Sequence, residues 1–390
     1  MFKKTIFMSG ATGFIGSHLA AKFLKIGYKV IALSRMKNNI PARQRLLQAI
    51  NAVDPELYLT EENLIDIEGD MEDDLENWMF QIKEKNLDEI DEVWHLAAIF
   101  KIKKQTQNEV ESVNINGVRK ILQLVKTINN KKTPRYFHIS TAYSQGKSTD
   151  TLCEDIEKDK NVFRTLYDWS KYGGEKAVQD EQKRSNLDVT ILRPSIVVSS
   201  YGSKLVYNAA YYTVLETFYS ITKRAKVTLG DDFDGNIGIR YWCIPESKLN
   251  VIPVDFAVNA MHLISVNQKL RSQKLKIFNI INENAPSIRQ ITRIYCESLN
   301  ITGIDLVSDK SIFDKEPMSP LERLFNRSIA FQAPYTRENV KFSVDHFRKV
   351  VPEEILPTPV VDDDFLRDIN RHFIEAQEKK LSEKKSAVLA

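Results

Sequence analysis

The first 200 residues alternate short apolar runs with longer segments of helical length. The apolar runs are TIFMS (5–9), YKVIALS (28–34), LIDIEGD (64–70), EVWHLAA (92–98), RYFHIS (135–140) and DVTILRP (188–194). Strands that are covered on both faces have continuous apolar runs, so these segments predict buried parallel strands. Helices are predicted between them, for example over residues 14–26, 110–128 and 165–182. This alternation predicts an α/β fold, a doubly wound parallel sheet of the Rossmann type.

The regular alternation ends near residue 200, which suggests two interleaved parts. Residues 1–200 are expected to form the sheet domain, to which the chain returns near 251–281, where apolar runs reappear. Residues 201–375 are expected to form a smaller lobe that binds the substrate. The charge-rich residues 376–390 have little periodic apolar content and are expected to form a disordered tail.

Composition narrows the class of protein. The 390 residues are 43% hydrophobic and 27% charged, the balance of an ordinary globular protein. Lys and Arg number 55 against 52 Asp and Glu, so the bulk charge predicts no nucleic-acid partner. No stretch of about 18 apolar residues is present, so no transmembrane segment is predicted.

The three cysteines, Cys153, Cys243 and Cys296, are far apart in sequence. They have neither the spacing of metal ligands nor the even number of a disulfide set, so we predict core thiols and no metal site. With no secretory signal at the N-terminus, this favours a reducing compartment and a cytoplasmic location. The oligomeric state stays open.

A glycine-rich loop, SGATGFIGSHLA (9–20), directly follows the first predicted strand. A dinucleotide fold needs glycine here for a tight turn and for close approach of the backbone to the pyrophosphate, which binds at the helix N-terminus. The spacing is G-x-x-G-x-x-G and not the usual G-x-G-x-x-G. The loop predicts a dinucleotide site at Gly10, Thr12, Gly13, Phe14, Ile15 and Gly16.

The end of the second strand indicates which dinucleotide binds. NAD sites place an acidic residue there to bind the ribose 2′-hydroxyl, but this strand ends in Ser34 and Arg35, with Arg43 and Arg45 following. A guanidinium can hold a 2′-phosphate through charge-assisted hydrogen bonds, so NADP(H) is favoured over NAD(H). The alternative is a solvated basic face.

Three further segments are expected to line the cofactor. Asp70, after the third strand, could accept a hydrogen bond from the adenine amino group, and Met71 adjoins it. The small residues Ala97 and Ala98 follow the fourth strand. For His95, next to them, a structural role and a cofactor contact stay open.

The spacing Tyr-x-x-x-Lys occurs four times, at Tyr143/Lys147, Tyr167/Lys171, Tyr172/Lys176 and Tyr219/Lys223. The spacing alone therefore identifies no site. Two of the pairs share the predicted helix over 165–182. Five residues amount to about 500° of helical rotation, so Tyr172 should point about 140° away from Tyr167.

Motifs in order over roughly the first 265 residues resemble the extended short-chain dehydrogenase/reductase superfamily. They are GATGFIG, GDM (69–71), HLAA, VNINGV (113–118), HISTAYSQG (138–146), YDWSK and RPSIV (193–197). The resemblance implies an active site made of a Ser or Thr after the fifth strand and a Tyr-x-x-x-Lys on the next helix. Only Tyr167 and Lys171 occupy that place. It further implies Thr141, with Ser140 as the adjacent alternative, Asn114 as a supporting residue, and Ser140, Pro194 and Ile196 as cofactor-binding residues.

The chemistry expected of this set is carbonyl reduction. Lys171, one helical turn from Tyr167, would bind the nicotinamide ribose and lower the pKa of the Tyr167 phenol. Thr141 would hold the substrate carbonyl oxygen while Tyr167 donates a proton to it. Asn114 would support the backbone or a water chain, with a packing role as the alternative.

Within the superfamily, SRMKNNIPARQRLLQAI, HISTAY, YDWSKYGGEK and RPSIVV are similar to thioester reductase domains and fatty acyl-CoA reductases. The stretch QAPYTRENVKFS (332–343) has a slighter similarity to the latter. This implies an acyl thioester substrate, on coenzyme A or on a carrier protein, that is reduced to an aldehyde and possibly to an alcohol. The aromatic stretch 206–221 could wall an acyl channel, with a plain core helix as the alternative. Lys204, Lys223, Arg224 and Lys226 could meet phosphates, with a solvated basic face as the alternative.

Two other functions are compatible with the same motifs. A nucleotide-sugar epimerase or dehydratase shares every motif down to Tyr-x-x-x-Lys. A redox-silent NADP-binding regulator could use the same fold. The complete Thr141, Tyr167 and Lys171 set argues against the regulator, because a pure binding protein has no use for the phenol.

Overall fold

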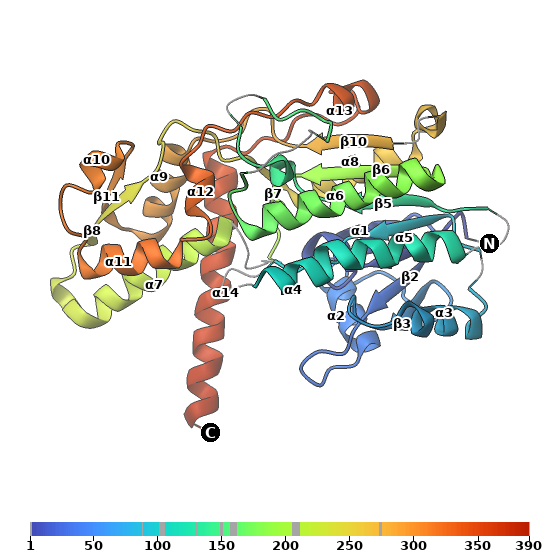
Figure 1. The fold of residues 1–390 in the computed structure, drawn as a ribbon. Helices are drawn as coiled ribbons and strands as arrows, with labels where there is room; N and C mark the ends of the chain where they lie inside the picture. The colour runs from blue at the N-terminus through green and yellow to red at the C-terminus, as the bar shows by residue number, and fades with distance from the viewer. Residues whose placement is uncertain are drawn as a thin grey trace.

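The structure is a computed structural model that describes residues 2–87, 89–100, 106–128, 132–148, 151–156, 162–204, 211–272 and 275–389. Its centre is a seven-stranded parallel sheet in the order β10-β6-β5-β4-β1-β2-β3 (Figure 1). The fold class predicted from the alternating runs is confirmed. The strands are β1 (Thr5–Ser9), β2 (Lys29–Ser34), β3 (Leu64–Glu68), β4 (Glu92–His95), β5 (Arg135–Ile139), β6 (Val189–Pro194) and β10 (Leu275–Ile280).

Helices cover both faces of this sheet. One face packs against α1 (Phe14–Lys25), α2 (Ala42–Val53) and α8 (Val254–Val266). The other face packs against α3 (Leu75–Glu84), α5 (Gly117–Thr127) and α6 (Leu166–Ser185). The burial of apolar strand side chains on both faces explains the continuous apolar runs in the sequence.

The sheet changes direction between β1 and β4. From β1 the chain builds outward through β2 and β3, and from β4 it builds the other way through β5, β6 and finally β10. In open α/β sheets, ligands bind outside the carboxyl ends of the strands at such a switch point. The loops after β1 and β4, which hold the glycine turn and Ala97–Ala98, meet there.

A second lobe, with its own apolar core, sits beyond the carboxyl ends of the strands (Figure 1). Its strands are β8 (Asn236–Trp242) and β11 (Thr302–Val307), and β7 (Ile196–Val198) pairs with β9 (Val251–Pro253) next to the main sheet. Its helices are α7 (Tyr211–Leu229), α9 (Ile288–Leu299), α10 (Lys310–Phe313), α11 (Pro320–Ser328), α12 (Ala333–Thr336) and α14 (Asp363–Leu389).

The remaining elements are short or irregular. They are α4 (Gln107–Glu111), the π-helix η1 (Ser112–Asn116), the 3₁₀ turns η2 (Ala142–Gln145), η3 (Gly230–Asp232) and η4 (Gln268–Ser272), and α13 (Asp345–Val350).

The structure departs from the sequence expectations in three places. The segment expected to be a disordered tail continues α14 to Leu389, because Glu, Ala, Gln, Lys and Leu are good helix formers. The aromatic helix runs from Tyr211 to Leu229, and residues 206–210 lie outside the described part. Cys153 is exposed and not a core thiol, since it lies in an irregular segment.

No helix in the described ranges is long and apolar enough to cross a membrane.

Candidate active site

The glycine turn leaves no room for side chains. Gly10 has φ +78°, and a Cβ there would lie 2.6 Å from the backbone nitrogen of Ala97. A Cβ on Gly16 would lie 2.1 Å from the carbonyl oxygen of Gly10. Gly13, the N-cap of α1, provides no side-chain cap, so the first N–H groups of the helix remain available to an anion. This cradle fits a dinucleotide pyrophosphate.

Two arginines lie beside the turn. Arg35 forms an ion pair with Asp70, and Arg45 donates to the Arg35 carbonyl oxygen at 2.6 Å and to Thr12 Oγ1 at 3.5 Å. Burial, together with the nearby Arg35 charge, lowers the pKa of Arg45. The two guanidiniums repel each other, and an anion between them would relieve that repulsion. Asp70 pairs with Arg35 in this structure, and the adenine contact expected of Asp70 stays a prediction.

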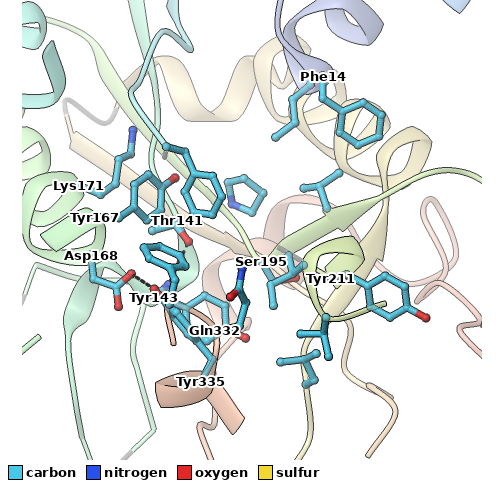
Figure 2. A pocket seen from close by; sticks show the side chains of 18 of the residues that line it. Phe14, Thr141, Tyr143, Tyr167, Asp168, Lys171, Ser195, Tyr211, Gln332 and Tyr335 are labelled. Carbon is cyan, nitrogen blue, oxygen red and sulfur yellow. Dashed lines mark hydrogen bonds between the residues drawn. The ribbon is translucent and has the colours of Figure 1, made fainter. Parts of the chain in front are cut away.

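A single cavity of about 300 Å³ extends from the glycine turn into the second lobe (Figure 2). It passes the carboxyl ends of β5 and β6 and the first turns of α6. Most of the predicted site residues line it: Gly10, Gly13, Phe14, Ile15, Gly16, Ala98, Ser140, Thr141, Tyr167, Lys171, Pro194 and Ile196. The other predicted residues lie outside its wall, namely Thr12, Ser34, Arg35, Arg45, Asp70, Met71, Ala97 and Asn114.

Helix α6 carries Tyr167 and Lys171 into the cavity. It begins where Thr165 caps the backbone N–H of Asp168 at 3.2 Å. Lys171 is buried, and its Nζ donates to the Ile139 carbonyl oxygen at 2.6 Å. Burial lowers the pKa of Lys171 to about 8, against the opposing effect of the Glu175 carboxylate. The Lys171 side chain is therefore mostly in its protonated, charged form at neutral pH.

The Tyr167 phenol does not have the lowered pKa that the sequence predicted. Burial, with the Asp168 carboxylate, raises the pKa of Tyr167 above its usual value. The Tyr167 ring packs edge-on against Phe100 at 4.9 Å, and the Lys171 ammonium is turned to the Ile139 carbonyl. The predicted lowering is therefore wrong for this structure, and Tyr167 is a neutral acid at pH 7.

Two hydroxyls end β5 at the cavity. Thr141 Oγ1 accepts the backbone N–H of Tyr143 at 3.3 Å, and its own hydrogen can still be donated to a ligand. Ser140 Oγ is buried without a hydrogen-bond partner among the described residues. Both side chains line the cavity, so the geometry leaves each able to meet a carbonyl oxygen.

Asn114 stands behind the site in the π-helix. Its Nδ2 donates to Ser170 Oγ at 2.8 Å, and its Oδ1 accepts the Ile99 N–H at 2.7 Å. This joins the loop after β4 to α6. The approach is close, because a Cβ on Gly174 would lie 2.9 Å from the Asn114 carbonyl oxygen. Asn114 is thus placed to position α6.

The other tyrosines of the repeated spacing lie differently. Tyr172 packs near Phe163, with ring centroids 5.3 Å apart, and Tyr219 lies beneath Lys223. Neither belongs to the described cavity wall. Tyr143 does belong to it, which the sequence argument missed, because the 3₁₀ turn after Thr141 folds its ring inward.

The cavity wall also contains residues that were not named individually as site residues from the sequence. Asp168, Gln332 and Tyr335 supply polar groups, and the apolar part is Phe100, Phe331, Tyr211, Val214, Tyr241, Leu249, Ile288, Ile291 and Tyr295. The sequence signal for Tyr211 and Val214 was the aromatic stretch 206–221, and the signal for Gln332 and Tyr335 was the similarity noted for residues 332–343. The other members come from helices whose cavity-facing residues look like ordinary core.

The basic residues of the lobe do not border the cavity. Lys223 forms an ion pair with Glu378 at 2.8 Å. It lies nine residues beyond Val214 on α7, about 13 Å along the helix. The cavity therefore gives no support to a contact between these basic residues and substrate phosphates.

Sequence relatives include reductases and an epimerase. Dihydroflavonol 4-reductase of Arabidopsis thaliana is 28% identical over 249 residues, which covers 59% of the chain and 60% of that protein. Fatty acyl-CoA reductase wat of Drosophila melanogaster is 24% identical over 348 residues, which covers 80% of the chain and 63% of that protein. The chain spans about three fifths of the length of these two relatives. UDP-glucose 4-epimerase of Haemophilus influenzae is 25% identical over 309 residues, which covers 76% of the chain and 83% of that protein.

Two solved structures share the fold over nearly the whole chain. The terminal R domain from the myxalamid PKS-NRPS biosynthetic pathway has a TM-score of 0.71 at 18% identity and covers 97% of this chain and 91% of its own. A thiolation-reductase di-domain from an archaeal non-ribosomal peptide synthetase has a TM-score of 0.73 at 19% identity. The match covers 96% of this chain and 76% of that structure's chain. A family profile described as "Male sterility protein" matches residues 8–261. The chain therefore belongs to the male sterility protein family, within the extended short-chain dehydrogenase/reductase superfamily.

Proposed function

We propose that the protein is an NADPH-dependent reductase that converts an acyl thioester, on coenzyme A or a carrier protein, to an aldehyde. The observation that carries the proposal is the single cavity from the glycine turn, past Thr141 and Tyr167, to an apolar wall in the second lobe. That wall, with Tyr211, Val214 and Ile291, is suited to a hydrocarbon chain.

The cofactor assignment rests on two features. The glycine cradle fits the pyrophosphate of a nicotinamide dinucleotide, because any side chain at Gly10 or Gly16 would fill it. Arg35 and Arg45 lie where the adenosine ribose is expected, with no acidic residue at the end of β2, which favours a 2′-phosphate. When bound, the reduced nicotinamide supplies the hydride.

Thr141, Tyr167 and Lys171 each have a different role in the proposed reaction. Thr141 donates its hydroxyl hydrogen to the thioester carbonyl oxygen and holds it in place. Tyr167, neutral at pH 7, transfers its phenolic proton to that oxygen as negative charge develops there. Lys171 binds the nicotinamide ribose, and its positive charge stabilises the phenolate that remains.

The relatives also include an epimerase and a dihydroflavonol reductase, so a nucleotide sugar or a dihydroflavonol is an alternative substrate. A nucleotide sugar carries a diphosphate, which binding sites commonly meet with cationic side chains. Among the described lining residues, Lys171 is the one cation, and it belongs to the catalytic group. This observation favours an uncharged acyl group, and not a diphosphate, as the part of the substrate that the cavity encloses.

The test is NADPH oxidation by the purified protein with a panel of acyl-CoA thioesters, UDP-sugars and a dihydroflavonol. The proposal expects turnover with medium or long acyl thioesters. Turnover confined to a nucleotide sugar or to the dihydroflavonol would reject it.

A further inference from the structure

One carboxyl group in the cavity has no task in the reaction as outlined so far. Asp168 follows Tyr167 on α6, its side chain is fully buried, and it lines the same cavity. Its Oδ1 accepts the Tyr335 hydroxyl at 2.7 Å, whereas Oδ2 has no hydrogen-bond partner among the described residues. A buried carboxyl oxygen without a partner is costly, and Asp168 lines the space that a substrate would fill.

Arg164, the cation whose charge lowers the pKa of Asp168, is engaged by other groups. Arg164 donates to the Gly146 carbonyl oxygen at 2.7 Å and forms its ion pair with Glu338 at 2.8 Å. The other titratable groups near Asp168 are Glu338, whose charge raises the pKa of Asp168, and the phenols of Tyr335, Tyr167 and Tyr143. Figure 2 shows the Asp168 carboxyl below Tyr167, with its hydrogen bond to Tyr335 drawn as a dashed line.

We propose that Asp168 is a second catalytic acid, which protonates the sulfur that leaves when the tetrahedral intermediate breaks down. The proposal rests on the thioester reductase function above. Each of two neighbouring side chains then donates one proton. Tyr167 protonates the oxygen of the thioester carbonyl, and Asp168 protonates the sulfur.

Once hydride and the Tyr167 proton have been added, the intermediate is a hemithioacetal and Tyr167 is a phenolate. The phenolate takes back the hydroxyl proton, the C=O bond re-forms, and the C–S bond breaks with its electron pair on sulfur. That sulfur receives the proton of Asp168, so aldehyde and free thiol result. Asp168, now a carboxylate, regains a proton from water before the next turnover.

The environment of Asp168 suits this task. Burial raises the pKa of Asp168 to about 7, against the opposing effects of the Tyr335 hydrogen bond and the Arg164 charge. A thiol has a pKa near 8.5, so an acid of this strength transfers its proton to a thiolate downhill. The acid form dominates below about pH 7, so thioester reduction should fall as the pH rises past that value.

A structural role must be separated from a catalytic one. Asp168 lies in the first turn of α6, where an acidic residue favours the helix dipole, and it ties Tyr335 to this helix. Asp168→Asn keeps the shape and an acceptor for Tyr335 but cannot give up a proton. Asp180→Asn, at an exposed position of the same helix, is the matched control.

The experiment is a single turnover in which NADPH oxidation and thiol release are recorded together. In the wild-type protein and in Asp180→Asn, thiol release should keep pace with NADPH oxidation. In Asp168→Asn it should lag at least tenfold behind, and the lag should shrink with an aryl thioester, whose thiolate leaves without protonation. Reduction of the matching free aldehyde, which has no leaving thiol, should stay within a few-fold of wild type. Asp168→Glu, which keeps the acid, should shorten the lag.

Two results would overturn the proposal. One is an Asp168→Asn protein that releases thiol in step with NADPH oxidation at the wild-type rate. The other is a variant in which aldehyde reduction falls as far as thioester reduction, since that indicates a general structural defect. A wild-type protein that releases no thiol at all would instead reject the thioester reductase function itself.

Discussion

Tyr167 is one of four tyrosines that precede a lysine by four residues, and its position selects it. It lines the cavity with Thr141 and Lys171, whereas Tyr172 on the same helix packs near Phe163. Tyr167→Phe should therefore lower kcat by about 10²–10⁴, the usual contribution of a general acid, and leave NADPH affinity within a few-fold.

Tyr172→Phe is the control and should retain most of the wild-type turnover. Steady-state kinetics together with NADPH titration of both variants provide the comparison. A dead Tyr172→Phe protein beside an active Tyr167→Phe protein would show that the assignment of the acid is wrong.

The two arginines at the adenosine end give a prediction about cofactor choice. Arg35→Ala should weaken NADPH binding by about 1.5–3 kcal/mol and NADH binding much less, because only NADPH carries the 2′-phosphate. Arg43→Ala is a suitable control, since Arg43 is engaged by the Leu64 carbonyl and by Asp66. Equal losses for both cofactors, measured by fluorescence titration, would reject the NADP assignment.

At the scale of elements, α6 places two adjacent glycines against the π-helix, and only one of them meets its backbone. A Cβ on Gly174 would lie 2.9 Å from the Asn114 backbone carbonyl, whereas one on Gly173 would meet the flexible tip of Ile115. Alanine gains about 1 kcal/mol of helix propensity at either position. Gly173→Ala should thus be close to neutral, and Gly174→Ala should lower both the melting temperature and kcat by moving Asn114. Thermal unfolding and kinetics of the pair check this, and equal behaviour of the two variants would contradict it.

The elements also show what the sequence could predict. Continuous apolar runs identified six strands of the central sheet, and the glycine turn and the Tyr167–Lys171 pair followed from motifs placed on those strands. The wall formed by Gln332, Tyr335 and α9 could not be found this way. Cavity-facing and core-facing side chains of a buried helix have the same composition, and only the packing of the lobe on the sheet distinguishes them.

The raised pKa of Tyr167 also could not be predicted from the sequence. The sequence gives the spacing to Lys171 but not the burial of the ring or the direction in which the ammonium points. Here burial outweighs the expected effect of the charge. Asp168 was overlooked for the same reason, because its position in the first turn of a helix is typical of an exposed acidic residue.

At the scale of the whole molecule, the sheet and the lobe together make one cavity that neither has alone. The sheet contributes the glycine turn and the proton donors, and the lobe contributes the apolar wall on α7 and α9. If that wall holds an acyl chain, each buried methylene should contribute about 0.8 kcal/mol, so KM should fall as the chain lengthens until the cavity is full.

The most direct measurement of the central claim is the stoichiometry of thiol release during NADPH oxidation, with acyl thioesters of increasing chain length on coenzyme A and on a carrier protein. The account predicts one free thiol for the first hydride consumed and a KM that falls with chain length. Epimerisation or dehydration of a sugar releases no thiol. A folded protein that binds NADP(H) but releases no thiol from acyl thioesters on either carrier would contradict the account.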